Sequence, residues 1–141
     1  MSLTSLSITR LYTEDDRIPD PNSPEKEHYN PSWPEIESAV RQLDGVHRSI
    51  VIIGKDDPEI DFMGIGGGAG GVYRCFVVTE EGKEVTLLNP DESSTQVRDI
   101  FMGQQTKISA RECLPLPLVL EAARTYAQSS QMNPALIWQE R

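Results

Sequence analysis

Histidine and cysteine are scarce in this chain of 141 residues, which contains two of each. Cys75 and Cys113 lie far apart and form no C-x-x-C pair, so we expect reduced thiols rather than a disulfide framework. His28 and His47 lie in no H-x-E or H-E-x-x-H pattern and at no other spacing typical of a zinc site. We therefore expect neither a metal nor a cofactor.

Basic residues and long apolar runs are also few. The chain has 13 Lys and Arg against 22 Asp and Glu, a formal net charge of -9. Because phosphate recognition needs clustered cations, this composition argues against nucleic-acid binding and against docking on anionic lipid. No run approaches the roughly 18 apolar residues of a membrane span, and no signal peptide is visible. We expect a cytoplasmic protein that binds neither nucleic acid nor membranes.

The order of predicted elements indicates an α+β fold. We expect one domain over residues 1–141, with an antiparallel β-sheet and two main helices packed on one of its faces. The segment 13–30 is acidic and rich in proline, which predicts a connector loop. The expected strands are 3–12, 48–54, 60–65, 72–79 and 85–88, with a weaker pair within 97–102 and 107–113, and the expected helices are 32–45 and 117–129.

The first helix has the clearest local signals. Ser32 and Glu35 have the spacing of a capping box, in which each side chain accepts a hydrogen bond from the backbone of the other residue. Pro34 suits the first turn, where its missing N–H costs no hydrogen bond. Gly45 is a natural stop. The sequence therefore predicts a capped amphipathic helix that packs on the sheet.

Residues 64–71 are unusually rich in glycine, and Gly66–Gly71 match G-x-G-x-x-G. In dinucleotide-binding proteins these glycines lead into a helix whose N-terminal amides bind the pyrophosphate. Here residues 72–78 have the composition of a strand, so we favour a tight crossing where the missing Cβ atoms allow positive φ and close approach by another group, such as a Trp side chain. A small-ligand-binding or regulatory domain that uses residues 64–71 remains the alternative.

Catalytic patterns are few, so we expect the chain not to be an enzyme. No nucleophile, base and orienting group occur at recognisable spacing. A hydrolase built on Cys75 or Cys113 with one of the histidines is a third alternative, which rests only on the presence of these residue types.

Acidic residues cluster along the first two thirds of the chain. Such clusters form either a solvated surface or a negative face that steers the protein onto a basic partner. The candidate partner-binding residues are Glu14, Asp15, Asp16, Asp56, Asp57, Glu59, Asp61, Glu80 and Glu81.

Several stretches together resemble the Imm1 family of bacterial immunity proteins. They are 30–45 (NPSWPEIESAVRQLDG), 50–53, 62–68 leading into 72–73, 117–127 and 133–138. The resemblance implies a non-enzymatic antitoxin that binds a secreted toxin domain of a polymorphic toxin system, often a nucleic-acid deaminase, and blocks its basic active-site surface. It also implies structural roles for the family motif residues Trp33, Gly66, Gly67, Gly68 and Trp138. We expect a cognate toxin domain as partner, with the chain a monomer or weak homodimer.

Overall fold

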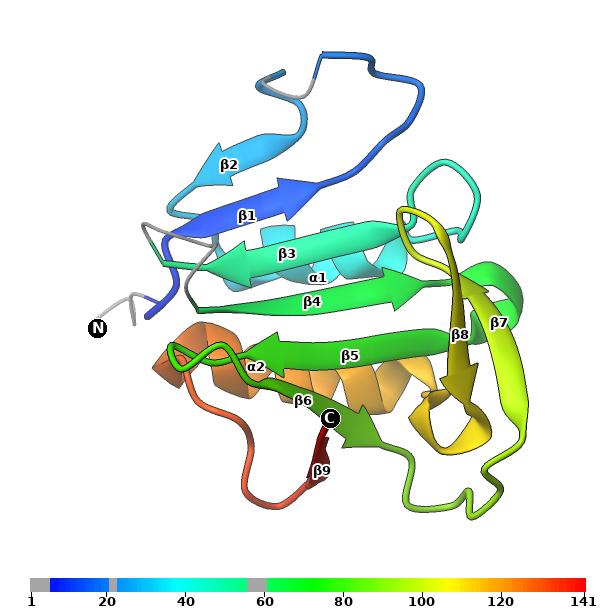
Figure 1. Cartoon of the computed structure of the whole chain (residues 1–141). Helices are drawn as coiled ribbons and strands as arrows, with labels where there is room; N and C mark the ends of the chain where they lie inside the picture. Colours follow the sequence, from blue (N-terminus) through cyan, green and yellow to red (C-terminus); the bar gives the residue numbers. More distant parts are fainter. Residues whose placement is uncertain (1–5, 21–22, 56–60) are drawn as a thin grey trace.

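A seven-stranded antiparallel sheet forms the centre of the computed structural model, which describes residues 6–20, 23–55 and 61–141 (Figure 1). The strand order is β2-β1-β3-β4-β5-β6-β9. The strands are β1 (Arg10–Thr13), β2 (Glu27–Tyr29), β3 (Ile50–Gly54), β4 (Phe62–Gly67), β5 (Tyr73–Val78), β6 (Glu84–Leu88) and β9 (Ile137–Glu140). Helices α1 (Trp33–Arg41) and α2 (Leu116–Ser129) lie behind the sheet in Figure 1. The predicted α+β architecture is confirmed.

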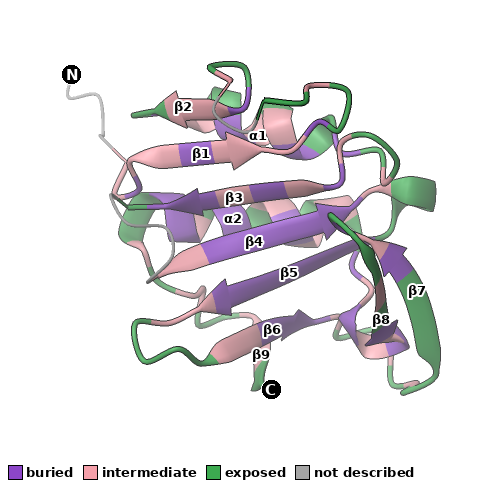
Figure 2. Cartoon of the chain, turned by 45° about the horizontal axis from the view of Figure 1, so that its top comes forward, coloured by how far each residue is buried: buried purple, intermediate pink, exposed green. Residues whose placement is uncertain are grey.

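The core lies between the sheet and the two helices. Alternate strand residues point to this face, as expected for the two-residue period of a strand. Figure 2 shows that β4 and β5, at the centre of the sheet, are almost entirely buried. The fully or nearly fully buried contributors include Val51, Ile53, Met63, Ile65, Cys75, Val77 and Leu87 from the strands, and Ile36, Val40, Val119, Ala122, Ala123, Tyr126 and Ala127 from the helices.

Helix α1 begins as its sequence predicts. The Ser32 hydroxyl accepts a hydrogen bond from the Glu35 amide (3.3 Å), and a Glu35 carboxylate oxygen accepts one from the Ser32 amide (3.1 Å). The helix ends at Arg41, four residues before the predicted stop at Gly45. It ends early because the Leu43 amide bonds to Val40 in a tighter turn and the Asp44 amide bonds to Arg48.

Strands β7 (Val97–Phe101) and β8 (Gln105–Ser109) form a separate two-stranded sheet. This hairpin crosses in front of one end of β4 and β5, on the face away from the helices (Figure 1). Ile100, Met102 and Ile108 form a second small core with Phe76 there. The weak strand pair is therefore confirmed, although residues 110–112 form the 3-10 turn η2 (Ala110–Glu112) instead of extending β8.

Both edge strands of the main sheet differ from the sequence prediction. Strand β2 lies inside segment 13–30, so that segment is not a loop throughout, and the C-terminal tail forms β9. In neither edge strand do buried and exposed residues alternate regularly. Both faces of such a strand are partly exposed, so it needs no alternation of apolar and polar residues. The N-terminal strand begins at Arg10, later than predicted, and residues 3–5 of that prediction lie outside the described residues.

Candidate functional site

The glycine-rich segment connects β4 to β5 through the 3-10 turn η1 (Ala69–Gly71). A Cβ on Gly66 would lie 2.4 Å from the Met102 Cβ, and one on Gly67 would lie 2.6 Å from the Ile100 Cδ1. Gly67 and Gly68 have φ values of +95° and +108°. The predicted close approach is confirmed, but the approaching groups are the hairpin's side chains and the Leu43 backbone rather than a Trp. A strand instead of a phosphate-binding helix follows these glycines.

The two tryptophans make contacts elsewhere. The Arg124 guanidinium lies over the Trp33 ring, 5.7 Å from its centroid, so Trp33 joins α1 to α2. The Trp138 indole N–H donates to the Asn133 carbonyl (3.0 Å). Both contacts are consistent with the packing roles that the resemblance implies.

Asp61 and Glu80 lie at one end of the sheet and line the same cavity of about 340 Å³. The buried Tyr126 hydroxyl, from α2, donates to Asp61 Oδ1 at 2.7 Å. Burial and the neighbouring carboxylate raise the Tyr126 pKa, so the hydroxyl stays protonated and remains a donor. Glu81, in the adjoining turn, is exposed. Three further candidates, Asp56, Asp57 and Glu59, lie outside the described residues.

Glu14, Asp15 and Asp16 lie at the opposite end, where β1 leaves the sheet beside the start of β3 (Figure 1). The Glu14 carboxylate accepts hydrogen bonds from Lys26 Nζ (3.1 Å) and from the Tyr12 hydroxyl. Burial of Tyr12 and its hydrogen bond to Glu14 raise the pKa of Tyr12 to about 12. The exposed Asp16 pairs with the His47 ring at 2.7 Å. The structure thus does not bring the six acidic candidates that it describes together on one surface.

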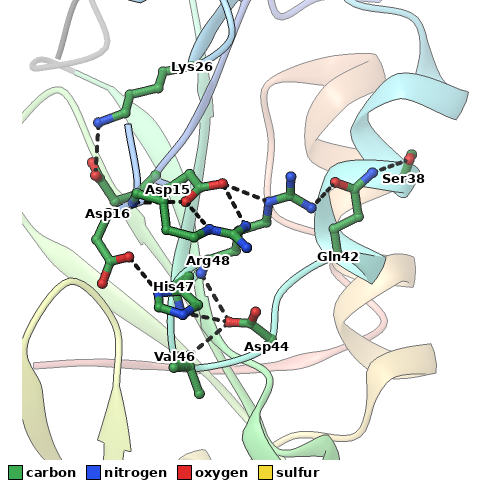
Figure 3. A network of polar contacts seen from close by, with 11 residues as sticks. Asp15, Asp16, Lys26, Ser38, Gln42, Asp44, Val46, His47 and Arg48 are labelled. Carbon is green, nitrogen blue, oxygen red and sulfur yellow. Dashed lines mark hydrogen bonds and ion pairs between the residues drawn. The ribbon is translucent and has the colours of Figure 1, made fainter. Parts of the chain in front are cut away.

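Asp15 is the most strongly paired of these carboxylates (Figure 3). It is 7% exposed and accepts two hydrogen bonds from the Arg17 guanidinium (2.8 and 2.9 Å) and one from Arg48 Nε (3.3 Å). The Arg17 hydrogen bonds hold its pKa well below its usual range. Arg48 also donates to Gln42 Oε1 at 2.6 Å, which links the connector to α1. Asp15 therefore has its charge neutralised within the chain.

A larger cavity of about 750 Å³ lies between this connector, α1 and strands β1 and β3. Leu11, Leu43 and Val51 contribute apolar surface to it, while Glu25 and His28 contribute polar groups. The cavity therefore lies between the N-terminal segment and the first helix.

Neither thiol is activated. Burial raises the pKa of Cys75 to about 12, and burial is also the main cause of the raised Cys113 pKa. Because the thiolate is the reactive form, both groups are poor nucleophiles at neutral pH. Among the described residues, no three His, Cys, Asp or Glu side chains are placed to hold a metal ion. The same part of the chain contains no helix that is long and apolar enough to cross a membrane.

Two features of the site were not predicted from the sequence. One is the Tyr126 hydroxyl that orients Asp61 from 65 residues away along the chain. The other is the internal neutralisation of Glu14 and Asp15, for which the nearby Arg17 was the only local signal.

Comparison with known proteins supplies the remaining evidence. The model of a protein family described as "Immunity protein Imm1" matches residues 24–140. No curated protein matches the chain significantly. Immunity proteins are generally not enzymes, and they act by binding a cognate toxin protein; the match therefore indicates a toxin-neutralising role. On this match, the chain belongs to the Imm1 family of immunity proteins.

Proposed function

We propose that this chain neutralises a nucleic-acid deaminase toxin by covering the basic surface with which the toxin holds its substrate. The observation that carries the proposal is the family match over residues 24–140. The net charge of -9 supports it, because a toxin that binds phosphates must present Lys and Arg side chains. An acidic protein competes for the same surface without catalysing any reaction.

Asp61, Glu80 and Glu81 are the described acids best placed to meet that basic surface. They lie at one end of the sheet, and Asp61 and Glu80 share a cavity. The described partner of Asp61 is the uncharged Tyr126 hydroxyl, so its negative charge is retained. The nearest described cation to Glu81 is Lys83, at 3.8 Å. We propose that this acidic end steers the chain onto the toxin, since charge complementarity acts mainly on the association rate.

The test removes three charges from the acidic end in one variant and three charges from other places in a control. In the acidic-end variant, Asp61→Asn, Glu80→Gln and Glu81→Gln, we expect association with the cognate toxin domain to slow about tenfold at low salt. The amide oxygen introduced by Asp61→Asn can still accept the Tyr126 hydrogen bond. The control, Asp16→Asn, Glu25→Gln and Glu121→Gln, loses the same net charge elsewhere.

The measurement is stopped-flow or surface-based association at several salt concentrations. The difference between the two variants should shrink as salt rises, because screening weakens exposed charge interactions. Equal association rates for the acidic-end variant and the control at low salt would remove this end of the sheet from the proposal.

A further inference from the structure

The sheet face opposite the helices, which we call the open face, includes two rows of residues that run across the strands. Pairing across the strands places the residues of each row side by side. The first row is Tyr29, Arg10, Gly54, Phe62, Val78 and Glu84. The second row is Glu27, Tyr12, Ile52, Gly64, Phe76, Thr86 and Gln139.

The open face concentrates aromatic residues in a chain that has few. Four of its nine aromatic side chains lie in these rows: Phe76 is buried against the β7–β8 hairpin, Tyr12 and Phe62 are half-buried, and Tyr29 is exposed. Tyr29 is 67% exposed. In Figure 2 the hairpin β7–β8 crosses the far ends of β4 and β5, and within the described chain no helix or strand is drawn over the first row. Aromatic and Arg side chains are enriched at the centres of protein interfaces.

Neighbouring groups hold these rings in place. The Arg10 guanidinium lies 5.1 Å from the Tyr29 ring centroid and also pairs with Glu27. The almost fully buried Arg74 lies 4.6 Å from the Phe76 centroid, and Phe62 meets Phe76 edge to face at 6.2 Å. A surface that is already ordered loses little side-chain entropy when a partner covers it.

The charges of the open face select the kind of partner. Arg10 pairs with Glu27, and Arg74 pairs with Glu84 at 3.0 Å, so the middle of the face is internally compensated. Beyond Phe62 and Val78, at the ends of the same strands, lie Asp61, whose carboxylate accepts the hydrogen bond from Tyr126 of α2, and Glu80. Neither carboxylate is paired with a described cation. An apolar, compensated centre beside an acidic end is complementary to an apolar patch bordered by Lys and Arg. A second copy, which also carries -9, would repel it.

We infer that the open face is the surface that binds the cognate toxin domain, with Tyr29 and Phe62 as anchoring side chains. The inference rests on the proposed function and adds to it the place of contact. The acidic end then speeds the encounter, while the aromatic rows slow dissociation.

The test compares two side chains of this face, the exposed Tyr29 and the half-buried Phe62, with an exposed apolar side chain elsewhere. Tyr29→Ala, at the sheet edge, and Phe62→Ala should each weaken binding of the cognate toxin domain about 30-fold, mainly through faster dissociation. The control is Val46→Ala, which truncates a side chain that is 58% exposed between α1 and β3 and should change the affinity less than twofold. Circular dichroism and thermal melting establish that each variant is folded.

Each outcome bears on a different statement. Suppose that the wild-type chain binds the toxin, and that the folded Tyr29→Ala variant binds it as tightly as the Val46→Ala control does. The open face is then not the contact surface, and the inference is overturned. The proposed function would survive that result. If the wild-type chain itself does not bind, the proposed function fails, and the inference fails with it.

Discussion

Replacing Gly68 with alanine is expected to lower the free energy of unfolding by about 4 kcal/mol. The φ angle of +108° at Gly68 is one that residues with a Cβ rarely adopt. A Cβ there would also lie 2.4 Å from the Leu43 carbonyl oxygen and 3.0 Å from the Asp44 amide nitrogen. Both contacts are with backbone, which cannot rotate away as a flexible side chain could. The backbone strain and the steric overlap therefore both lower the free energy of unfolding.

Gly70→Ala provides the matched control in the same segment. Gly70 also has a positive φ, +64°, but apart from Gly70 and its two chain neighbours no atom of the described residues lies within 4 Å of the position that its Cβ would occupy. The expected loss is only the backbone cost of the left-handed region, about 1 kcal/mol. Urea denaturation of the two variants measures the difference. Equal losses would show that the Leu43 backbone does not constrain this crossing.

Truncating Tyr126 to alanine is expected to lower the free energy of unfolding by about 4 kcal/mol, because its ring is 1% exposed between α2 and the sheet. Tyr126→Phe keeps the ring and removes only the hydroxyl that donates to Asp61. That change should cost about 1 kcal/mol, the usual net contribution of one hydrogen bond. Chemical denaturation of both variants separates packing from hydrogen bonding. If Tyr126→Phe lowered the free energy of unfolding as much as Tyr126→Ala, the ring could not supply most of the stabilisation.

Tyr126→Phe also has a consequence for binding. Without its donor, Asp61 is free to take other rotamers, so we expect a weaker toxin complex from the folded variant.

Elements that bury one face were predictable from the sequence. The capping box of Ser32 and Glu35 and the β-branched run at 50–53 indicated α1 and β3, because local chemistry and tertiary packing favour the same conformation there. The edge strands β2 and β9 were missed because neither presents a regular buried face, so no apolar period marks them. Their pairing is determined by the strands beside them.

The candidate site was less predictable for a different reason. A run of acidic letters does not reveal which carboxylates are neutralised by residues distant in the chain. Asp15 is paired with Arg48, 33 residues away, whereas the described partner of Asp61 is a tyrosine hydroxyl. The aromatic rows of the open face draw on different strands, so no single stretch of sequence contains their pattern.

Inhibition of the toxin itself tests the central claim most directly. The purified cognate toxin domain is assayed for nucleic-acid deamination while the chain is titrated into it. If the chain covers the substrate-binding surface, activity should fall linearly and vanish near one equivalent, and excess nucleic acid should slow the onset of inhibition. Undiminished deamination in the presence of excess chain would contradict the account.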